Sequence, residues 1–350
     1  MPAAAAAPSQ SLLAYHPAPG PGEQPQVVSF QEISAVLDGL LGQPVLESQA
    51  QAYRLRPEQV NICPVQTVGQ APLRPVLAGA EAQACVKTGY VDGDDVFVTK
   101  VAGGGGQCPG NTGLMMVFSQ RTLRLQCILQ DEGVLTELRT AAASAFVSSL
   151  FAPRQVSLIG LAGASVQALW QLRLLTYVTP CRKLLLLTRS QASAAKFAQR
   201  LRESPCSLDR EWQVEIAASA KDFSRCQLIH TCTSSKAPIL GLGDVASGGV
   251  HLTCVGADAP GKKELAPELV ASADLRICDS LAQSTYRGEF QGFGGDVVEI
   301  SAVLNAAEPE RNGYLRKGPD DRRITIFDSS GVATQDVAIA KLVAKSLSRL

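Results

Sequence analysis

The sequence predicts an α/β protein whose central part is a Rossmann-type domain with a doubly wound parallel sheet. Between about residues 53 and 130, short alternating apolar runs separated by glycine and aspartate are typical of a mostly antiparallel sheet. From residue 156 on, apolar strands alternate with helical stretches, which indicates right-handed βαβ units and a parallel sheet. With 350 residues, the chain is long enough for about two domains.

The composition excludes several classes of protein. Lys plus Arg and Asp plus Glu both number 32, and this balance argues against a nucleic-acid-binding surface, which is usually strongly basic. The most apolar segment, 156–178, is interrupted by Gln167, Gln171 and Arg173, so we do not expect it to cross a membrane. The ten cysteines form no C-x-x-C pair, which predicts no metal site and fits a reducing compartment.

The first 22 residues are rich in alanine and proline. They lack arginine and the apolar core of a signal peptide, so neither a secretory signal nor a transit peptide is expected. We therefore expect residues 1–22 to be a flexible tail and the protein to be cytoplasmic.

Two helices and a sheet are predicted before residue 150. Apolar residues at helical spacing predict a helix over Val27–Leu41, with Ser29 as its N-cap. Sheet strands are expected across Tyr53–Gln130, where the glycines 103–106 indicate a mobile loop. An alanine run favours a second helix over Leu135–Leu150.

The second half of the chain reads as strand and helix in alternation. The final stretch adds one strand, Ile324–Phe327, and a helix over Gln335–Leu347. The earlier apolar strands are predicted at Val156–Ala162, Lys183–Thr188, Gln227–Thr233, Val250–Gly256 and Leu275–Asp279.

The segment Gly163-Ala-Ser165-Val-Gln-Ala168 lies where the first of these strands ends and a helix begins. It departs at one position from the dinucleotide fingerprint G-x-G-x-x-G/A. Its first glycine allows a tight turn, and a pyrophosphate lies on the N-terminus of the following helix in such sites. Ser165 replaces the second glycine and offers a hydroxyl to a phosphate oxygen. We predict a nucleotide site; the alternative is a turn used only for packing.

The end of the second strand predicts the choice between NAD and NADP. An NAD site usually holds the ribose with Asp or Glu at this point, and an NADP site replaces it with Arg. Here the residues are Thr188-Arg189-Ser190, and no acidic residue occurs between Arg139 and Arg202. We therefore expect NADP(H), with Arg189 on the 2′-phosphate; NAD(H), with Arg189 a solvated loop charge, is the alternative.

Several motifs together resemble those of the ornithine cyclodeaminase/mu-crystallin family. The matching elements run from about Arg74 to the C-terminus: Lys100, Leu138-Arg139-Thr140-Ala-Ala-Ala, the Gly163–Ala168 turn, Thr188-Arg189-Ser190, Gly256-Ala-Asp258-Ala-Pro-Gly, Gly288-Glu289, and Phe327-Asp-Ser-Ser-Gly331 to Gln335-Asp336. The resemblance implies a Rossmann domain over 151–319 and a homodimer. It also implies a substrate and dimerisation domain made from both chain ends, 23–150 and 320–350.

The resemblance also implies roles for individual residues. Lys100, Arg139 and Arg74 would hold the carboxylate of a small 2-imino acid or amino acid substrate, and fixed cations are suited to orienting such a group. Asp258, at the carboxyl end of a predicted strand, would steady the reacting nitrogen and relay its proton, and Lys100 is the second expected catalytic residue; the alternative is that Asp258 caps a turn. Cofactor contacts are expected at Gly163, Ala164, Ser165, Val166, Gln167, Thr188, Arg189, Ser190, Thr231, Thr233, Ser234 and Gly331.

Three activities remain open within this family. The first is an NADP(H)-dependent reductase of C=N bonds in 2-imino acids, above all cyclic ketimines such as piperideine-2-carboxylate and pyrroline-2-carboxylate. The second is a lyase that cyclises ornithine or lysine with bound NAD. The third is a non-catalytic, NADPH-dependent binder of a small hormone-like ligand.

The chain departs from the family pattern at two positions, and the first departure favours the reductase over the lyase. Family lyases carry an acidic residue about a dozen positions before the lysine, whereas this chain has Val86-Lys87-Thr88-Gly-Tyr90 there. A second family lysine is replaced by Asp328. The lyase reaction needs several proton transfers on one bound intermediate, so the missing acid weakens that alternative most.

Overall fold

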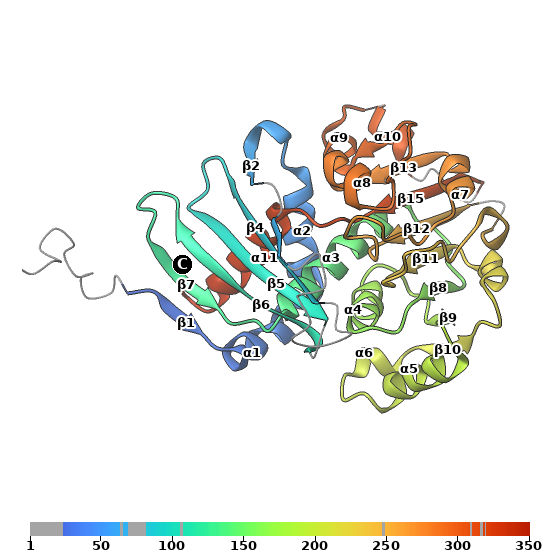
Figure 1. The fold of residues 1–350 in the computed structure, drawn as a ribbon, viewed down its shortest axis with the longest axis horizontal. Coiled ribbons are helices and arrows are strands. Elements are labelled where there is room, and N and C mark those ends of the chain that lie inside the picture. Colours follow the sequence, from blue (N-terminus) through green and yellow to red (C-terminus); the bar gives the residue numbers. More distant parts are fainter. Residues whose placement is uncertain are drawn as a thin grey trace, which may run out of the picture.

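The computed structural model describes residues 24–63, 66–68, 82–105, 108–246, 249–308, 310–315, 318 and 320–350. Two sheets lie side by side, each with its own helices (Figure 1). The predicted tail 1–22 and Arg74 fall outside the described residues. No helix in the described ranges is long and apolar enough to cross a membrane.

The first sheet is mixed and has the order β1-β7-β6-β5-β4-β2, with β3 paired to β4. Its β1 runs parallel to β7, and the remaining pairs are antiparallel, which confirms the predicted sheet type. Gly103 and Gly104 pair with both neighbouring strands, so the predicted mobile loop is wrong for these residues. The strands are β1 (Gln26–Val28), β2 (Val60–Ile62), β3 (Gln66–Val68), β4 (Ala82–Val91), β5 (Val96–Gly105), β6 (Cys108–Ser119) and β7 (Leu125–Leu129).

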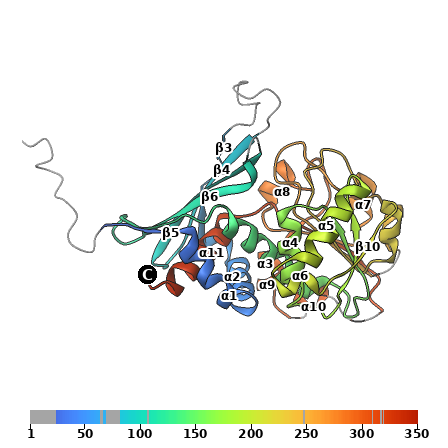
Figure 2. The same cartoon turned by 90° about the horizontal axis from the view of Figure 1, so that it is seen from below.

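Four helices pack together on one side of this sheet (Figures 1 and 2). They are α1 (Phe30–Leu40), α2 (Gln43–Arg54), α3 (Val134–Phe151) and α11 (Ala333–Ser346). Ser29 caps α1 as predicted, because its Oγ accepts from Glu32 N at 3.3 Å and Glu32 Oε2 accepts from Ser29 N at 2.8 Å. The three residues before Ser29 form β1 instead of a first helical turn.

The burial of β5 alternates along the strand. Val96, Val98 and Lys100 face the helices and are buried, while Phe97 and Thr99 point to the opposite face and are partly exposed. This period of two places Lys100 under α3 and α11.

The second sheet is all-parallel, with the order β10-β9-β8-β11-β12-β15-β13-β14. Its first five strands follow the doubly wound pattern, in which the order reverses between β8 and β11 and leaves a crevice at the carboxyl ends. The predicted fold class is therefore confirmed. The strands are β8 (Ile159–Ala162), β9 (Lys183–Leu187), β10 (Gln213–Ile216), β11 (Leu228–Thr231), β12 (Val250–Cys254), β13 (Leu275–Cys278), β14 (Val298–Glu299) and β15 (Ile324–Asp328).

One predicted boundary is wrong for one element. The strand β15, which follows residue 320, pairs with β12 and β13 inside the parallel sheet, although it was expected in the domain of the chain ends. Only α11 returns to the mixed sheet, where it packs against β4, β5 and β6. The chain therefore crosses between the two sheets at residues 329–332.

Helices cover both faces of the parallel sheet. They are α4 (Val166–Leu175), α5 (Gln191–Glu203), α6 (Ser207–Arg210), α7 (Pro267–Ser272), α8 (Leu281–Arg287), α9 (Ile300–Asn305) and α10 (Glu310–Tyr314), with short 3₁₀ turns at Pro57–Gln59, Ala220–Arg225 and Leu242–Asp244. The helix α3 packs against both α2 and α4, and so joins the two halves of the molecule (Figure 1).

Candidate active site

Two lysines from neighbouring strands meet under the helices. Lys87 of β4 and Lys100 of β5 are direct partners in the antiparallel register, so their side chains leave the same face of the sheet. Lys87 Nζ donates to the carbonyl of Gly331 at 2.8 Å, and Lys100 Nζ donates to Asp336 Oδ1 at 2.8 Å. They are 7% and 2% exposed.

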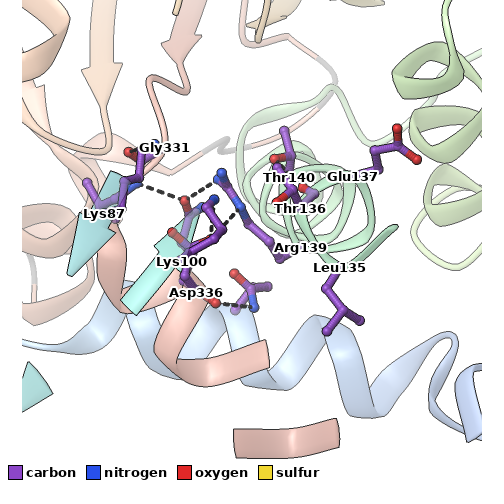
Figure 3. A network of polar contacts seen from close by, with 12 residues as sticks. Lys87, Lys100, Leu135, Thr136, Glu137, Arg139, Thr140, Gly331 and Asp336 are labelled. Carbon is purple, nitrogen blue, oxygen red and sulfur yellow. Dashed lines mark hydrogen bonds and ion pairs between the residues drawn. The ribbon is translucent and has the colours of Figure 1, made fainter. Parts of the chain in front are cut away.

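Arg139 approaches this pair from α3. Its guanidinium, 4% exposed as a residue, lies with Nε 3.1 Å from Asp336 Oδ1, and its Nη1 donates to Gln335 Oε1 at 2.8 Å. Figure 3 shows Lys87, Lys100 and Arg139 turned toward one another, while Glu137, which is also on α3, points away from them. The structure thus brings together Lys100 and Arg139, which are expected to bind a substrate carboxylate, and adds Lys87.

The first turn of α11 and the residues just before it supply the acceptors for these three cations. Gly331 has a φ of +80°, and a Cβ there would lie 2.8 Å from Arg139 Nη1 and 3.0 Å from Lys87 Nζ, so only glycine fits. Asp279 anchors the segment, because its carboxylate accepts from Gly331 N at 2.6 Å and from Ser330 Oγ at 2.7 Å. Gly331, predicted as a cofactor contact, therefore lies in the cation cluster.

Burial and mutual repulsion perturb these groups. Burial, together with Arg139 and Lys87, lowers the pKa of Lys100 to about 7 even though Asp336 opposes the shift. Burial and then Arg139 lower the pKa of Lys87 as well. Burial alone would raise the pKa of Asp336, but Lys100 and Arg139 outweigh it and hold that pKa below its ordinary value.

The cluster has more positive charge than the chain itself neutralises. Among the residues that the structure describes, Asp336 is the only carboxylate bonded to Lys87, Lys100 or Arg139. Buried charges are normally paired, because removal from water is costly. An arrangement of this kind can bind an anionic group, and a carboxylate suits both the forked guanidinium and the ammonium groups.

The predicted nucleotide turn lies where β8 meets α4. Gly163 has a φ of +124°, and a Cβ there would lie 2.8 Å from the carbonyl oxygen of Cys232. Ser165 is the N-cap of α4, and its Oγ accepts from Ala168 N at 3.3 Å. Ser165 is exposed and Ala164, Val166 and Gln167 are half-buried, so this helix start is open to a phosphate.

The end of β9 has the features expected of a ribose site. Arg189 is exposed and has no hydrogen bond or ion pair with any described residue. Thr188 Oγ1 donates to the carbonyl of Ser190 at 2.7 Å, and Ser190 caps α5 by accepting from Ser193 N at 3.2 Å. The bonds of Thr188 and Ser190 therefore fix the loop after β9, while the guanidinium of Arg189 bonds to no described residue.

The ends of β11 and β12 are joined by a buried carboxylate that the sequence did not reveal. Glu264 accepts from Thr231 Oγ1 at 2.6 Å, from the N and Oγ1 of Thr233 at 2.7 Å each, and from Gly256 N at 3.0 Å. The hydroxyls of Thr231 and Thr233 are thus already engaged, while Ser234 is exposed. Glu264 therefore holds together the loops that follow β11 and β12.

Asp258 lies in the loop after β12 and is half-exposed. Its Oδ1 is 2.5 Å from Lys262 Nζ, and its carbonyl oxygen accepts from Arg287 Nε at 2.7 Å. Arg287, buried at the end of α8, also reaches β4, where its Nη2 is 3.8 Å from Cys85 Sγ. Through Arg287, the Asp258 loop is connected to the strand that carries Lys87.

Sequence reasoning missed several of these residues. In the sequence, Lys87 is only a departure from the family pattern, and Gln335-Asp336 is only a motif match without an assigned role. The alternation of β4 could have placed Lys87 on the inner face, but its register with Lys100 is a long-range property.

A model of the ornithine cyclodeaminase/mu-crystallin family matches residues 107–349 of the chain. The uncharacterized cyclodeaminase y4tK of Sinorhizobium fredii is 31% identical over 281 residues, which cover 77% of this chain and 82% of the relative. The ketimine reductase mu-crystallin of Rattus norvegicus is 26% identical over 312 residues, which cover 87% and 91% of the two chains.

Solved structures with the same fold cover nearly the whole chain. An archaeal alanine dehydrogenase dimer with bound NAD has a TM-score of 0.76 at 24% identity and covers 93% of this chain and 97% of its own. The iminosuccinate reductase of Paracoccus denitrificans in complex with NAD+ has a TM-score of 0.72 at 26% identity, with coverages of 92% and 95%. Because the family model matches well over half of the sequence, this chain belongs to the ornithine cyclodeaminase/mu-crystallin family.

Proposed function

We propose that the protein is an NADP(H)-dependent reductase of the C=N bond in 2-imino acids. The observation that carries this proposal is the cluster of Lys87, Lys100 and Arg139 around the single carboxylate of Asp336. The cofactor, when bound, would supply a hydride to the imine carbon, which turns C=N into CH–NH while the reduced nicotinamide is oxidised. Relatives named ketimine reductase and iminosuccinate reductase support this type of reaction.

The chain's own residues would bind and orient the substrate. Lys100 and Arg139 hold the carboxylate beside the reacting carbon, because both present donors from rigid elements of the fold. Asp258 lies on the loop at the carboxyl end of β12, where its carboxylate would stabilise the protonated nitrogen of the imine. With the nitrogen already protonated, reduction needs no separate acid. Cyclic ketimines such as piperideine-2-carboxylate and pyrroline-2-carboxylate are the first candidates.

The features around β8 and β9 suit a dinucleotide. Gly163 permits the tight turn, and the open N-terminus of α4 presents N–H groups to a pyrophosphate. The free guanidinium of Arg189 favours NADP(H) over NAD(H), since it would pair with a 2′-phosphate.

The cofactor preference is tested by replacing Arg189. We expect Arg189→Ala to raise the KM for NADPH by about 10- to 100-fold and to leave the KM for NADH within about twofold, as the loss of one charge-assisted contact would. Arg202→Ala, which removes an exposed arginine from the last turn of α5, is the matched control and should change neither value. Equal effects of Arg189→Ala on both cofactors would contradict NADP(H) specificity.

The reaction itself is tested by mixing the purified protein with NADPH and each cyclic ketimine, and following the loss of nicotinamide absorbance from acidic to neutral pH. Turnover of at least one imine is expected. Release of ammonia from ornithine or lysine without net cofactor consumption would instead establish a cyclodeaminase. Ligand binding that strengthens with NADPH but gives no product would establish a binding protein.

A further inference from the structure

We infer that the substrate carries a second acidic group, and that Lys87 selects it with Arg287 beside it. This inference rests on the proposed function and narrows it from 2-imino acids in general to dicarboxylic ones. Lys87 would thus be a specificity-determining residue of the same site.

The first argument is the hydrogen bonding of Lys87. Its ammonium carries three protons, and its one bond within the described part of the chain goes to the carbonyl of Gly331 at 2.8 Å. The neutral carbonyl accepts one of these protons but does not neutralise the positive charge of the ammonium. The remaining protons therefore need acceptors, and burial of the residue to 7% exposure makes their absence costly.

The second argument is the charge of the cluster. Lys87, Lys100 and Arg139 together carry up to three positive charges around Asp336. One substrate carboxylate, added to Asp336, would neutralise two of them. A second acidic group would neutralise the third, and only then would all three buried cations be paired. Asp279 also interacts with Lys87 and offsets part of this charge, but its carboxylate oxygens are bonded to residues 329–331 rather than to a lysine.

The third argument is the position of Arg287. It is 6% exposed and reaches β4 at Cys85, two positions from Lys87 and therefore on the same face of the strand. Arg287 is also among the charges that depress the pKa of Lys87. Its Nε and Nη2 bond to the carbonyl of Asp258, and its Nη1 donates to no described residue. Arg287 is thus a fourth cation beside Lys87, and its Nη1 is a donor that no described residue accepts from.

The alternative is that Lys87 merely clamps Gly331. A clamp would contribute to stability and to the placement of α11, so its loss would weaken mono- and dicarboxylates alike. A residue that binds a second acidic group would change the ratio between them. The decisive readout is therefore selectivity rather than activity.

The experiment compares acids matched in chain length. Imines are formed in solution from ammonia with oxaloacetate or 2-oxobutanoate, and with 2-oxoglutarate or 2-oxopentanoate, and kcat/KM is measured with NADPH. Direct binding of succinate and butyrate to the protein with NADP+ present supplies a readout that needs no turnover. We expect the diacid to be favoured by at least about tenfold in at least one reactive pair and in the binding pair.

Three variants separate the roles of the lysines. Lys87→Met, which keeps the length of the side chain, should reduce the diacid preference to within about threefold, because it weakens the diacid far more than the matched monoacid. Lys100→Met should weaken both members of each pair without changing their ratio. Lys341→Met removes an ion pair with Asp94 outside the cluster and should change nothing.

Each outcome decides the inference. Reduction of monoacid imines with no diacid preference, or equal losses for both acids in Lys87→Met, would overturn it while leaving the proposed reductase standing. Failure of every imine to react, with succinate still favoured over butyrate through Lys87, would overturn the reductase and support the subsite. A thermal unfolding scan shows that each variant is folded.

Discussion

At the scale of single residues, the cluster depends on one carboxylate. Asp336 accepts from Lys100 and faces Arg139 while it is itself almost fully buried. A buried carboxylate between two cations is stable only while those cations remain charged, and burial works against the charge of the lysines. Lys100 is therefore balanced between its charged and neutral forms near neutral pH.

The first prediction concerns this balance. Because burial lowers the pKa of Lys100 from its ordinary value of 10.5 to about 7, the free protein carries a charged Lys100 below that pH and a neutral one above it. The charged form binds a carboxylate. We expect the affinity for butyrate, with NADP+ bound, to be constant below pH 7 and to fall with rising pH toward tenfold per unit. Titration calorimetry from pH 6 to about 9 measures this.

A substitution isolates the cause of that fall. Arginine stays protonated throughout the range, so Lys100→Arg should bind butyrate with little dependence on pH. Butyrate itself remains ionised at these pH values, as carboxyl groups of this type titrate near pH 4 to 5. The same slope in the wild type and in Lys100→Arg would show that another group titrates.

At the scale of elements, the parallel sheet could be predicted much better than its surroundings. The strands β8, β11 and β12 are buried on both faces and are mostly apolar, with His and Thr in β11 and β12 as the exceptions, which is a strong local signal. The edge strand β10 has only four residues with alternating exposure, so its signal is weak. The helix α2 was missed because Ser48 and Gln49 are buried on it and dilute its apolar face.

The contacts between elements are harder to predict from the sequence than the elements themselves. Lys100 and Arg139 carry their signal in sequence motifs, whereas Asp336, which pairs with both, is brought to them only by the return of α11. The insertion of β15 between β12 and β13 likewise follows from pairing over long range. Local sequence pattern and secondary-structure propensity therefore predict neither the contacts of Asp336 nor the position of β15.

The second prediction concerns Glu264, whose carboxylate connects the ends of β11 and β12. Glu264 accepts from four donors on Thr231, Thr233 and Gly256, and a glutamine there would turn an NH₂ group toward some of them. We expect Glu264→Gln to lower the free energy of unfolding by about 2–4 kcal/mol. Urea unfolding without cofactor measures it.

The exposed Glu268 at the start of α7 provides the control. Glu268→Gln should change stability by less than about 0.5 kcal/mol, as surface substitutions usually do. Equal urea midpoints for the two variants would mean that Glu264 contributes no more than a surface carboxylate.

At the scale of the whole molecule, no helix from the described part of the chain covers one face of the mixed sheet. The helices α1, α2, α3 and α11 gather on the face of Val96 and Val98 (Figure 2). On the opposite face, Phe97 and Phe118 stack at 4.7 Å between ring centroids and remain partly exposed. Partly exposed aromatic side chains on a sheet are typical of a surface that meets a partner.

The third prediction follows from this face. We propose that two copies of the chain pair through it, because the stacked rings of Phe97 and Phe118 remain partly exposed there. Because an apolar interface does not tolerate a buried unpaired charge, Phe97→Glu should convert a dimer into a monomer. Sedimentation velocity at micromolar concentration measures the mass. Gln199→Glu, which adds the same charge to the exposed side of α5, should remain a dimer. A monomeric wild type, or a Phe97→Glu variant that still sediments as a dimer, would place the interface elsewhere or remove it.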